Sequence, residues 1–290
     1  VNFNAIFSNP SLVIRNVDQV SRSTQIAFGD NSFAASGNST VANIDLTAGS
    51  VDIQAGTVYV ARGNPGGSTS TGQATATVGF AAGTFDINTL EVGYQTATGA
   101  NGATTGTLLV NNNGLVTTNN SLVSTGAVLS VNTPMRLART NGGTGAVNGT
   151  LTVNGGTVLA NAIVAGGGNS TINLNSGSTL VISNSAGTLA APIRTFNIGD
   201  ATLTLPALNA GGVLAVSNLV TGGSQNIINI SSVPPISSYP VTFTLISYVS
   251  GGGGNYVLGT LPAGNPNYAG SLLDTGNGVI QLKLTAGPVV

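Results

Sequence analysis

Residues 149–158 read Gly149-Thr150-Leu151-Thr152-Val153-Asn154-Gly155-Gly156-Thr157-Val158. Leu151 and Val153 are two positions apart, so an extended strand places both side chains on the same face. Gly156 follows after a short polar step, and glycine tolerates the positive φ that a sharp bend requires. Val158 then resumes the apolar pattern. The unit therefore predicts a strand, a bend and a second strand.

The same unit returns at four other places in the chain, at intervals of 21 to 43 residues. Each copy has an apolar pair two residues apart, a polar step, Gly or Asn, and a further apolar residue. The copies are Ile44, Leu46, Gly49 and Val51; Val78, Phe80, Gly83 and Phe85; Leu108, Val110, Asn113 and Leu115; and Ile172, Leu174, Gly177 and, one position late, Leu180. Such a repeat predicts a β-solenoid whose apolar residues point inward in columns, with the copies aligned on their bend residues.

The composition predicts an all-β protein. Of 290 residues only 15 are charged, whereas about 25% is usual. The 41% of apolar residues favours packed strands over disorder. A net charge of −1 argues against binding to nucleic acid. No apolar run approaches the roughly 18 residues of a membrane span. The absence of cysteine fits a secreted protein, and we expect an extracellular or cell-surface location.

Short strands after the bends suggest three strands per coil, as in a triangular parallel β-helix. They are expected at 57–60, 89–92, 121–123, 162–164 and 196–198. On this basis residues 1–38 form an N-terminal strand and a cap where the solenoid begins, and residues 39–206 form the β-helix repeats. Residues 207–290 form C-terminal coils and an atypical cap or small β-domain, because a solenoid needs terminal units that cover its ends.

Both ends of the chain suggest interactions. Val1, Phe3, Ala5 and Phe7 alternate with polar residues, so they share one face of a strand. Such a strand can add to the open edge of a neighbouring copy, and head-to-tail contact without closure gives a filament. The alternative is that residues 1–7 pair with their own first coil. The C-terminal part holds a group of tyrosines that either stack on sugar rings or pack as a cap: Tyr239, Tyr248, Tyr256 and Tyr268.

The acidic residues offer one candidate site. Asp52 and Asp86 each follow a bend glycine by three positions, which predicts that they stack on adjacent coils and point outward. The pair is interpreted as solvated and balanced by Arg62. Calcium bound between coils, with Asp45 and Glu91 as further ligands, and a catalytic dyad are the alternatives. We assign no catalytic, cofactor or metal site, because the chain has no histidine and no convincing pair of carboxylates.

The repeated unit resembles the autotransporter-associated β-strand repeat of bacterial surface proteins. Residues 149–158 carry the resemblance, together with Phe243-Thr244-Leu245-Ile246, Leu258-Gly259-Thr260-Leu261-Pro262 and Gly278-Val279-Ile280-Gln281-Leu282. The resemblance covers residues 40–285. It implies a right-handed β-helix exported to the cell exterior, in a family of mostly adhesive or structural passenger regions.

These observations favour a non-catalytic extracellular structural protein, a filament or surface-matrix subunit that assembles with itself. The first alternative is an adhesin that binds glycans or cell surfaces, and an outward row of aromatic side chains would favour it. A polysaccharide lyase or hydrolase is the remaining alternative, and it requires a cleft with two close carboxylates.

Overall fold

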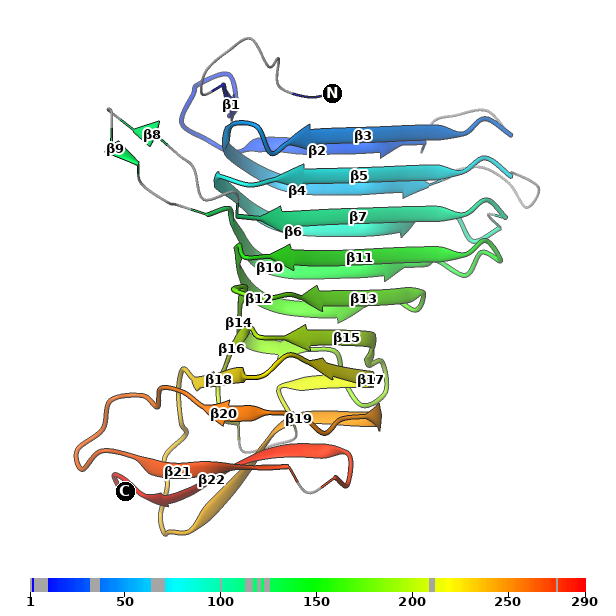
Figure 1. Ribbon diagram of the computed structural model, residues 1–290. Coiled ribbons are helices and arrows are strands. Elements are labelled where there is room, and N and C mark those ends of the chain that lie inside the picture. The colour runs from blue at the N-terminus through cyan, green and yellow to red at the C-terminus, as the bar shows by residue number, and fades with distance from the viewer. Residues whose placement is uncertain are drawn as a thin grey trace.

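The computed structural model describes residues 2, 10–31, 37–63, 71–99, 101–112, 117–118, 121–122, 126–208, 212–274 and 276–290. These residues form strands and no helix, so none of them belongs to a helix that could span a membrane. The strands lie one above another along the molecule, from β1 and β2 at one end to β21 and β22 at the other (Figure 1).

One ladder of parallel strands runs along the molecule. Each of its strands pairs in parallel with the next. In order they are β3 (Thr40–Leu46), β5 (Ala74–Phe80), β7 (Thr104–Asn111), β11 (Val147–Asn154), β13 (Asn169–Leu174), β15 (Ile193–Gly199), β17 (Leu214–Gly222) and β19 (Val241–Gly251).

A second parallel ladder is formed by the strands that follow in the chain. They are β4 (Ser50–Gly63), β6 (Gly83–Gln95), β10 (Val128–Arg139), β12 (Thr157–Ala165), β14 (Thr179–Ala186), β16 (Thr202–Leu205), β18 (Asn226–Ile230) and β20 (Tyr256–Leu258). At one end β1 (Ser11–Ile14) and β2 (Ser23–Asp30) both pair with β4. At the other end β21 (Ala269–Asp274) pairs antiparallel with β22 (Val279–Ala286), which pairs antiparallel with β19. The mostly parallel all-β fold is the one a β-solenoid requires.

The apolar columns of the first ladder are confirmed. Ile44, Val78, Leu108, Leu151, Ile172 and Phe196 lie opposite one another in successive strands. A second column contains Leu46, Phe80, Val110, Val153, Leu174 and Ile198. All are buried except Ile44, which is half-buried and packs against the core. Burial of apolar area at about 25 cal/mol per Å² makes these columns the main source of stability.

The alignment of the copies on their bend residues is wrong by two positions at the first bend. Val51 lies opposite Gly83, and Ile53 lies opposite Phe85. Val51 follows Leu46 by five positions, but Gly83 follows Phe80 by only three, because the second bend is shorter. Gly83 therefore belongs to β6 itself. Its φ of 86° and a Cβ position 1.9 Å from the Val51 carbonyl oxygen explain why glycine occupies it.

Two of the expected third strands also lie elsewhere. β9 (Ser121–Leu122) pairs antiparallel with β8 (Thr117–Thr118), and β10 takes the place beside β6. Asn113 and Leu115 lie outside the described residues. Residues 196–198 belong to β15 in the first ladder. The expected strands at 57–60, 89–92 and 162–164 lie within β4, β6 and β12, where they continue the strand before them.

Candidate functional site

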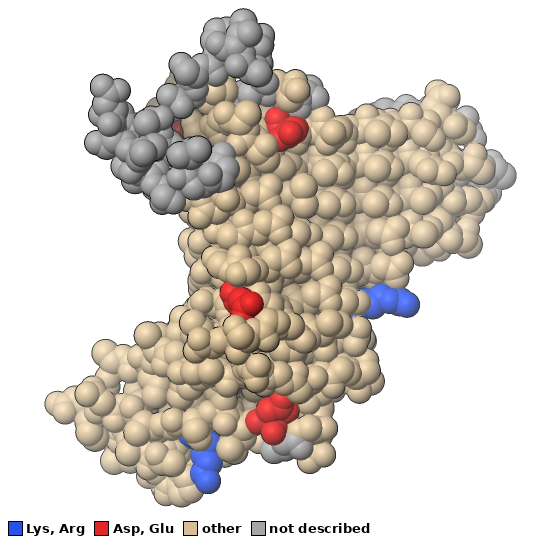
Figure 2. All heavy atoms as spheres, viewed as in Figure 1, with Lys and Arg blue, Asp and Glu red and all other residues tan. Residues whose placement is uncertain are grey.

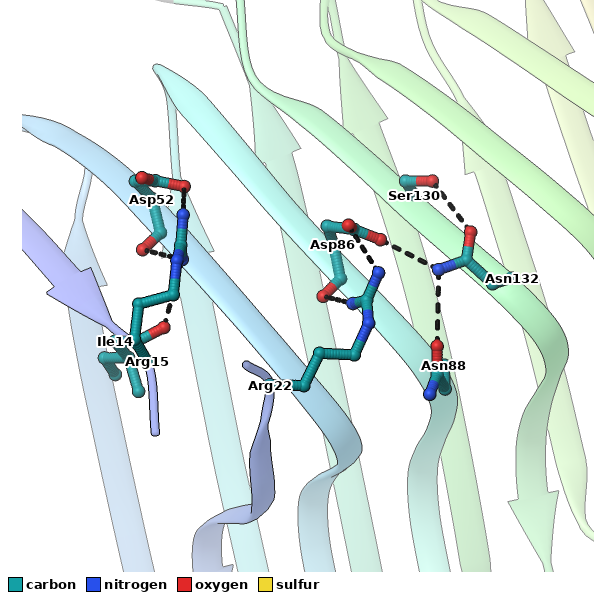
Figure 3. Close-up of polar contacts among 8 residues, drawn as sticks. All are labelled: Ile14, Arg15, Arg22, Asp52, Asp86, Asn88, Ser130 and Asn132. Atoms are coloured by element: carbon teal, nitrogen blue, oxygen red, sulfur yellow. Dashed lines mark hydrogen bonds and ion pairs between the residues drawn. The ribbon is translucent and has the colours of Figure 1, made fainter. Parts of the chain in front are cut away.

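Asp52 and Asp86 each pair with a different arginine (Figure 3). Arg15 Nη2 donates to Asp52 Oδ1 at 2.5 Å, and Arg22 Nη2 donates to Asp86 Oδ2 at 2.6 Å. Asn132 Nδ2 donates to the other oxygen of Asp86 at 2.9 Å. The predicted stacking of the two aspartates is wrong, because the shift of two positions places Asp52 opposite Thr84 and Asp86 opposite Gln54.

The environment of Asp86 favours its ionised form. Burial raises the pKa of this carboxyl, but the hydrogen bonds from Arg22 and Asn132 outweigh burial, and the pKa is lowered overall. Arg62, the expected partner of the aspartate pair, instead forms an ion pair with Asp30 on β2. Asp52 and Asp86 are thus separately neutralised and form no dyad.

The carboxylates proposed as further calcium ligands have other partners. Asp45 accepts hydrogen bonds from the Thr47 backbone N–H at 3.0 Å and from its hydroxyl at 2.7 Å. These bonds lower the pKa of Asp45. Glu91 is buried beside two arginines. Within the described ranges no three acidic, histidine or cysteine side chains gather in a way that could hold a metal ion, so these residues do not fit the coordination that calcium prefers.

The sequence does not predict one surface beside the second ladder, which we call the arginine–tyrosine flank. It lies next to a sharp bend, or corner, that β2, β4, β6 and β10 share. The residue at this corner has positive φ in all four strands: Gly29 (67°), Ala61 (62°), Gly93 (72°) and Ala138 (56°). Outside it lie Tyr59 and Tyr94, with ring centroids 6.0 Å apart and planes 18° from parallel. Arg62 Cζ is 4.6 Å from the centroid of Tyr59, and Arg139 Cζ is 4.5 Å from that of Tyr94.

Glu91 organises the basic part of this flank. Its side chain is only 3% exposed, and Oε1 accepts from Arg136 Nη1 at 2.9 Å and from Arg139 Nη1 at 3.0 Å. The other carboxylate oxygen, Oε2, is buried without a partner among the described residues. Burial raises the pKa of Glu91, and the two guanidinium groups only partly oppose this effect. Two arginines that are 32% and 38% exposed therefore share one carboxylate.

The four C-terminal tyrosines all pack against the core. The Tyr239 hydroxyl donates to the Pro288 carbonyl at 2.9 Å, and the Tyr248 hydroxyl lies 3.3 Å from Asp274 Oδ1. Burial raises the pKa of Tyr256 to about 12, and its hydroxyl lies 2.9 Å from that of Thr221. Tyr268 is half-buried. Such contacts are those of side chains that close the end of a core rather than of an open stacking platform.

The predicted assembly residues Val1, Phe3, Ala5 and Phe7 lie outside the described residues. Asn2 forms an isolated parallel bridge with Asp45 of β3. At this one residue the N-terminal segment therefore pairs with its own first coil, as the alternative interpretation holds.

Asparagine side chains form hydrogen-bonded rows on the outside of the first ladder. Asn154 Nδ2 donates to Asn111 Oδ1 at 2.8 Å, and Asn175 Nδ2 donates to Asn154 Oδ1 at 2.6 Å. Asn197 donates to Asn173 in the same way at 2.6 Å. Figure 2 shows isolated charged residues on an otherwise uncharged face. These amide rows therefore supply polar contacts between coils on a surface with few charges.

No family model, curated protein or solved structure matches this chain.

Proposed function

We propose that this chain is a non-catalytic extracellular structural protein, a filament or surface-matrix subunit joined end to end through strand edges. The observation that carries the proposal is the engagement of all eight carboxylates in hydrogen bonds or ion pairs within the fold. They are Asp18, Asp30, Asp45, Asp52, Asp86, Glu91, Asp200 and Asp274. In a chain without histidine, the engagement of every acidic side chain within the fold supports a role without acid–base catalysis.

A general rule and one feature of the ladders support a right-handed β-helix with about three strands per coil. Crossovers between parallel strands of one sheet are right-handed in about 98% of cases. β4 pairs with β1 over residues 50–53 and with β2 over residues 55–62, so one strand spans two segments of the coil. The strand of the first ladder is then the third segment.

The ends of the molecule support assembly through strand edges. β21 pairs with β22 alone among the described strands, which leaves its other edge for a further strand. Exposed edges are sites of chain association unless charge, proline or a covering element protects them. Ser271 and Leu272 lie in the middle of β21, and its only charged residue is Asp274, at the strand end.

Electron microscopy of negatively stained protein and light scattering over a range of concentrations test this function. Filaments or concentration-dependent growth are expected. A chain that stays monomeric at high concentration would contradict assembly. Deletion of residues 1–7 then identifies the connector, because filaments that persist unchanged in the deletion variant exclude the N-terminal strand.

A further inference from the structure

Arg136 and Arg139 have hydrogen-bond donors on the surface of the solenoid that pair with no described residue. A guanidinium has five N–H donors, and each of these arginines donates through Nη1 to the single oxygen Glu91 Oε1. Glu91 is buried and fixes both groups from beneath. Because their side chains are already ordered, binding of an anion costs little conformational entropy.

Two shallow hollows lie beyond the end of β10, whose last residue is Arg139. Thr140, the next residue, lines the first hollow with Gly167 and Gly168, and these two glycines also line the second. Arg194 lines the second hollow, where it is exposed and makes no ion pair with any described residue. We name this surface the arginine trough and define it by Arg136, Arg139, Gly167, Gly168 and Arg194.

The floor of the trough is held rigidly by the backbone of β10. Gly168 N–H donates to the Ala138 carbonyl at 2.9 Å, and Thr140 N–H donates to the Gly166 carbonyl at 2.9 Å. A Cβ atom on Gly166 would lie 2.3 Å from Arg139 Cα, so only glycine permits this approach. The small residues keep the trough shallow and open, which suits an extended chain better than an enclosed small molecule.

The charge of the trough differs from that of the whole chain. The trough holds three arginines, and the Glu91 carboxylate beneath Arg136 and Arg139 is the acidic group paired with them, which gives a net charge of +2 on a chain of net charge −1. Arg139 ends β10 in the second ladder, and Arg194 is the second residue of β15 in the first ladder. β15 follows β14 in the chain, and β14 lies two steps from β10 along the second ladder. Two strand spacings, about 10 Å in all, separate the backbones of β10 and β14 along the axis, so a polymer with repeated negative groups can contact both cations.

We propose that the arginine trough binds an acidic polysaccharide through carboxylate or sulfate groups. The planar fork of arginine matches such oxyanions and can bind them with two hydrogen bonds. Nucleic acid is disfavoured, because three arginines neutralise few phosphates and the Tyr59 and Tyr94 rings are occupied by each other and by arginines. This inference goes beyond the structural role and does not depend on end-to-end assembly.

Binding of the full chain to immobilised polygalacturonate, dextran sulfate and neutral dextran tests the proposal. We expect at least one polyanion to bind, with affinity that falls as salt increases, and neutral dextran not to bind. The double variant Arg139→Gln/Arg194→Gln should weaken binding about tenfold or more. Lys283→Gln is the matched control, because it removes one positive charge from the antiparallel β22 outside the trough. Its affinity should stay within about twofold of wild type.

The two polyanions distinguish recognition of carboxylate from recognition of sulfate. The polymer whose affinity falls in the double variant carries the group that the trough binds. Arg194→Gln alone provides a second test if the double variant misfolds, because Arg194 is exposed and forms no ion pair with the described residues. The proposal would be overturned if neither polyanion bound, or if neutral dextran bound equally well. It would also be overturned if Lys283→Gln lost as much affinity as the double variant. The same holds if the folded Arg194→Gln or double variant kept the affinity of the wild type.

Discussion

Replacement of Leu151 by alanine tests the central feature of the fold, the inward column of the first ladder. Leu151 is completely buried and lies between Leu108 on β7 and Ile172 on β13. The substitution removes three carbon atoms and leaves a cavity whose walls belong to neighbouring rungs. Buried leucine-to-alanine changes cost about 2–5 kcal/mol. We expect the upper half of this range, because both neighbours are held by continuous ladders and cannot collapse into the space.

The measurement is urea unfolding followed by circular dichroism, with hydrogen exchange to locate the effect. Stability in a solenoid is approximately a sum of rung and nearest-neighbour terms, so exchange should increase most in β7, β11 and β13. Thr150→Ala is the matched control, since Thr150 is the outward neighbour and should change stability by no more than about 0.5 kcal/mol. If Leu151→Ala is no less stable than Thr150→Ala, the inward column is wrong.

The remaining predictions concern the acids and the glycine segment. The folded-state pKa of Glu91 is raised, so its contribution to stability should be present below its unfolded pKa and lost as pH rises through the folded pKa. Urea unfolding measures this dependence of the unfolding free energy on pH. The dependence should be absent in Glu91→Gln. Gly166→Val should lower the melting temperature by several degrees, because its Cβ meets Arg139; an unchanged melt contradicts the tight approach. No reducing ends or unsaturated sugars should be released from polysaccharides, and release that disappears in Asp52→Ala or Asp86→Ala would contradict the non-catalytic role.

The sequence predicts the inward columns well because their signal is local. Leu151 and Val153 alternate with Thr150 and Thr152, and a period of two allows only one face for each set. The pattern survives in Ile172 and Leu174 although the interval between copies differs, since the extra residues lie between strands. Strand existence and the buried face therefore follow from short stretches read one at a time.

Register between copies does not follow from short stretches. Asp52 and Asp86 occupy equivalent places after glycines, yet they fall out of alignment because the two bends differ in length by two residues. Gly49 lies in a bend, whereas Gly83, its counterpart in the next copy, belongs to β6. The glycines therefore do not fix the alignment of the copies. For the same reason the sequence wrongly predicts a strand of the coil at 121–123. Leu122 instead belongs to β9, which forms a separate antiparallel pair with β8.

The arginine–tyrosine flank shows which feature would have been a safe reference point. Its corner repeats as an inward apolar residue, a residue of positive φ and an outward polar residue: Val60-Ala61-Arg62, Val92-Gly93-Tyr94 and Leu137-Ala138-Arg139. The corner has the same length in all three copies, so Arg62, Tyr94 and Arg139 align although other connections vary. Of these three corners only the one at Gly93 carries the residue type that predicts positive φ, because Ala61 and Ala138 give no such signal in the sequence. Alanine in the left-handed region costs about 1–2 kcal/mol, and the aligned outward side chains and buried Glu91 stabilise the corner against this cost. The flank is therefore visible only after the ladders fix the register.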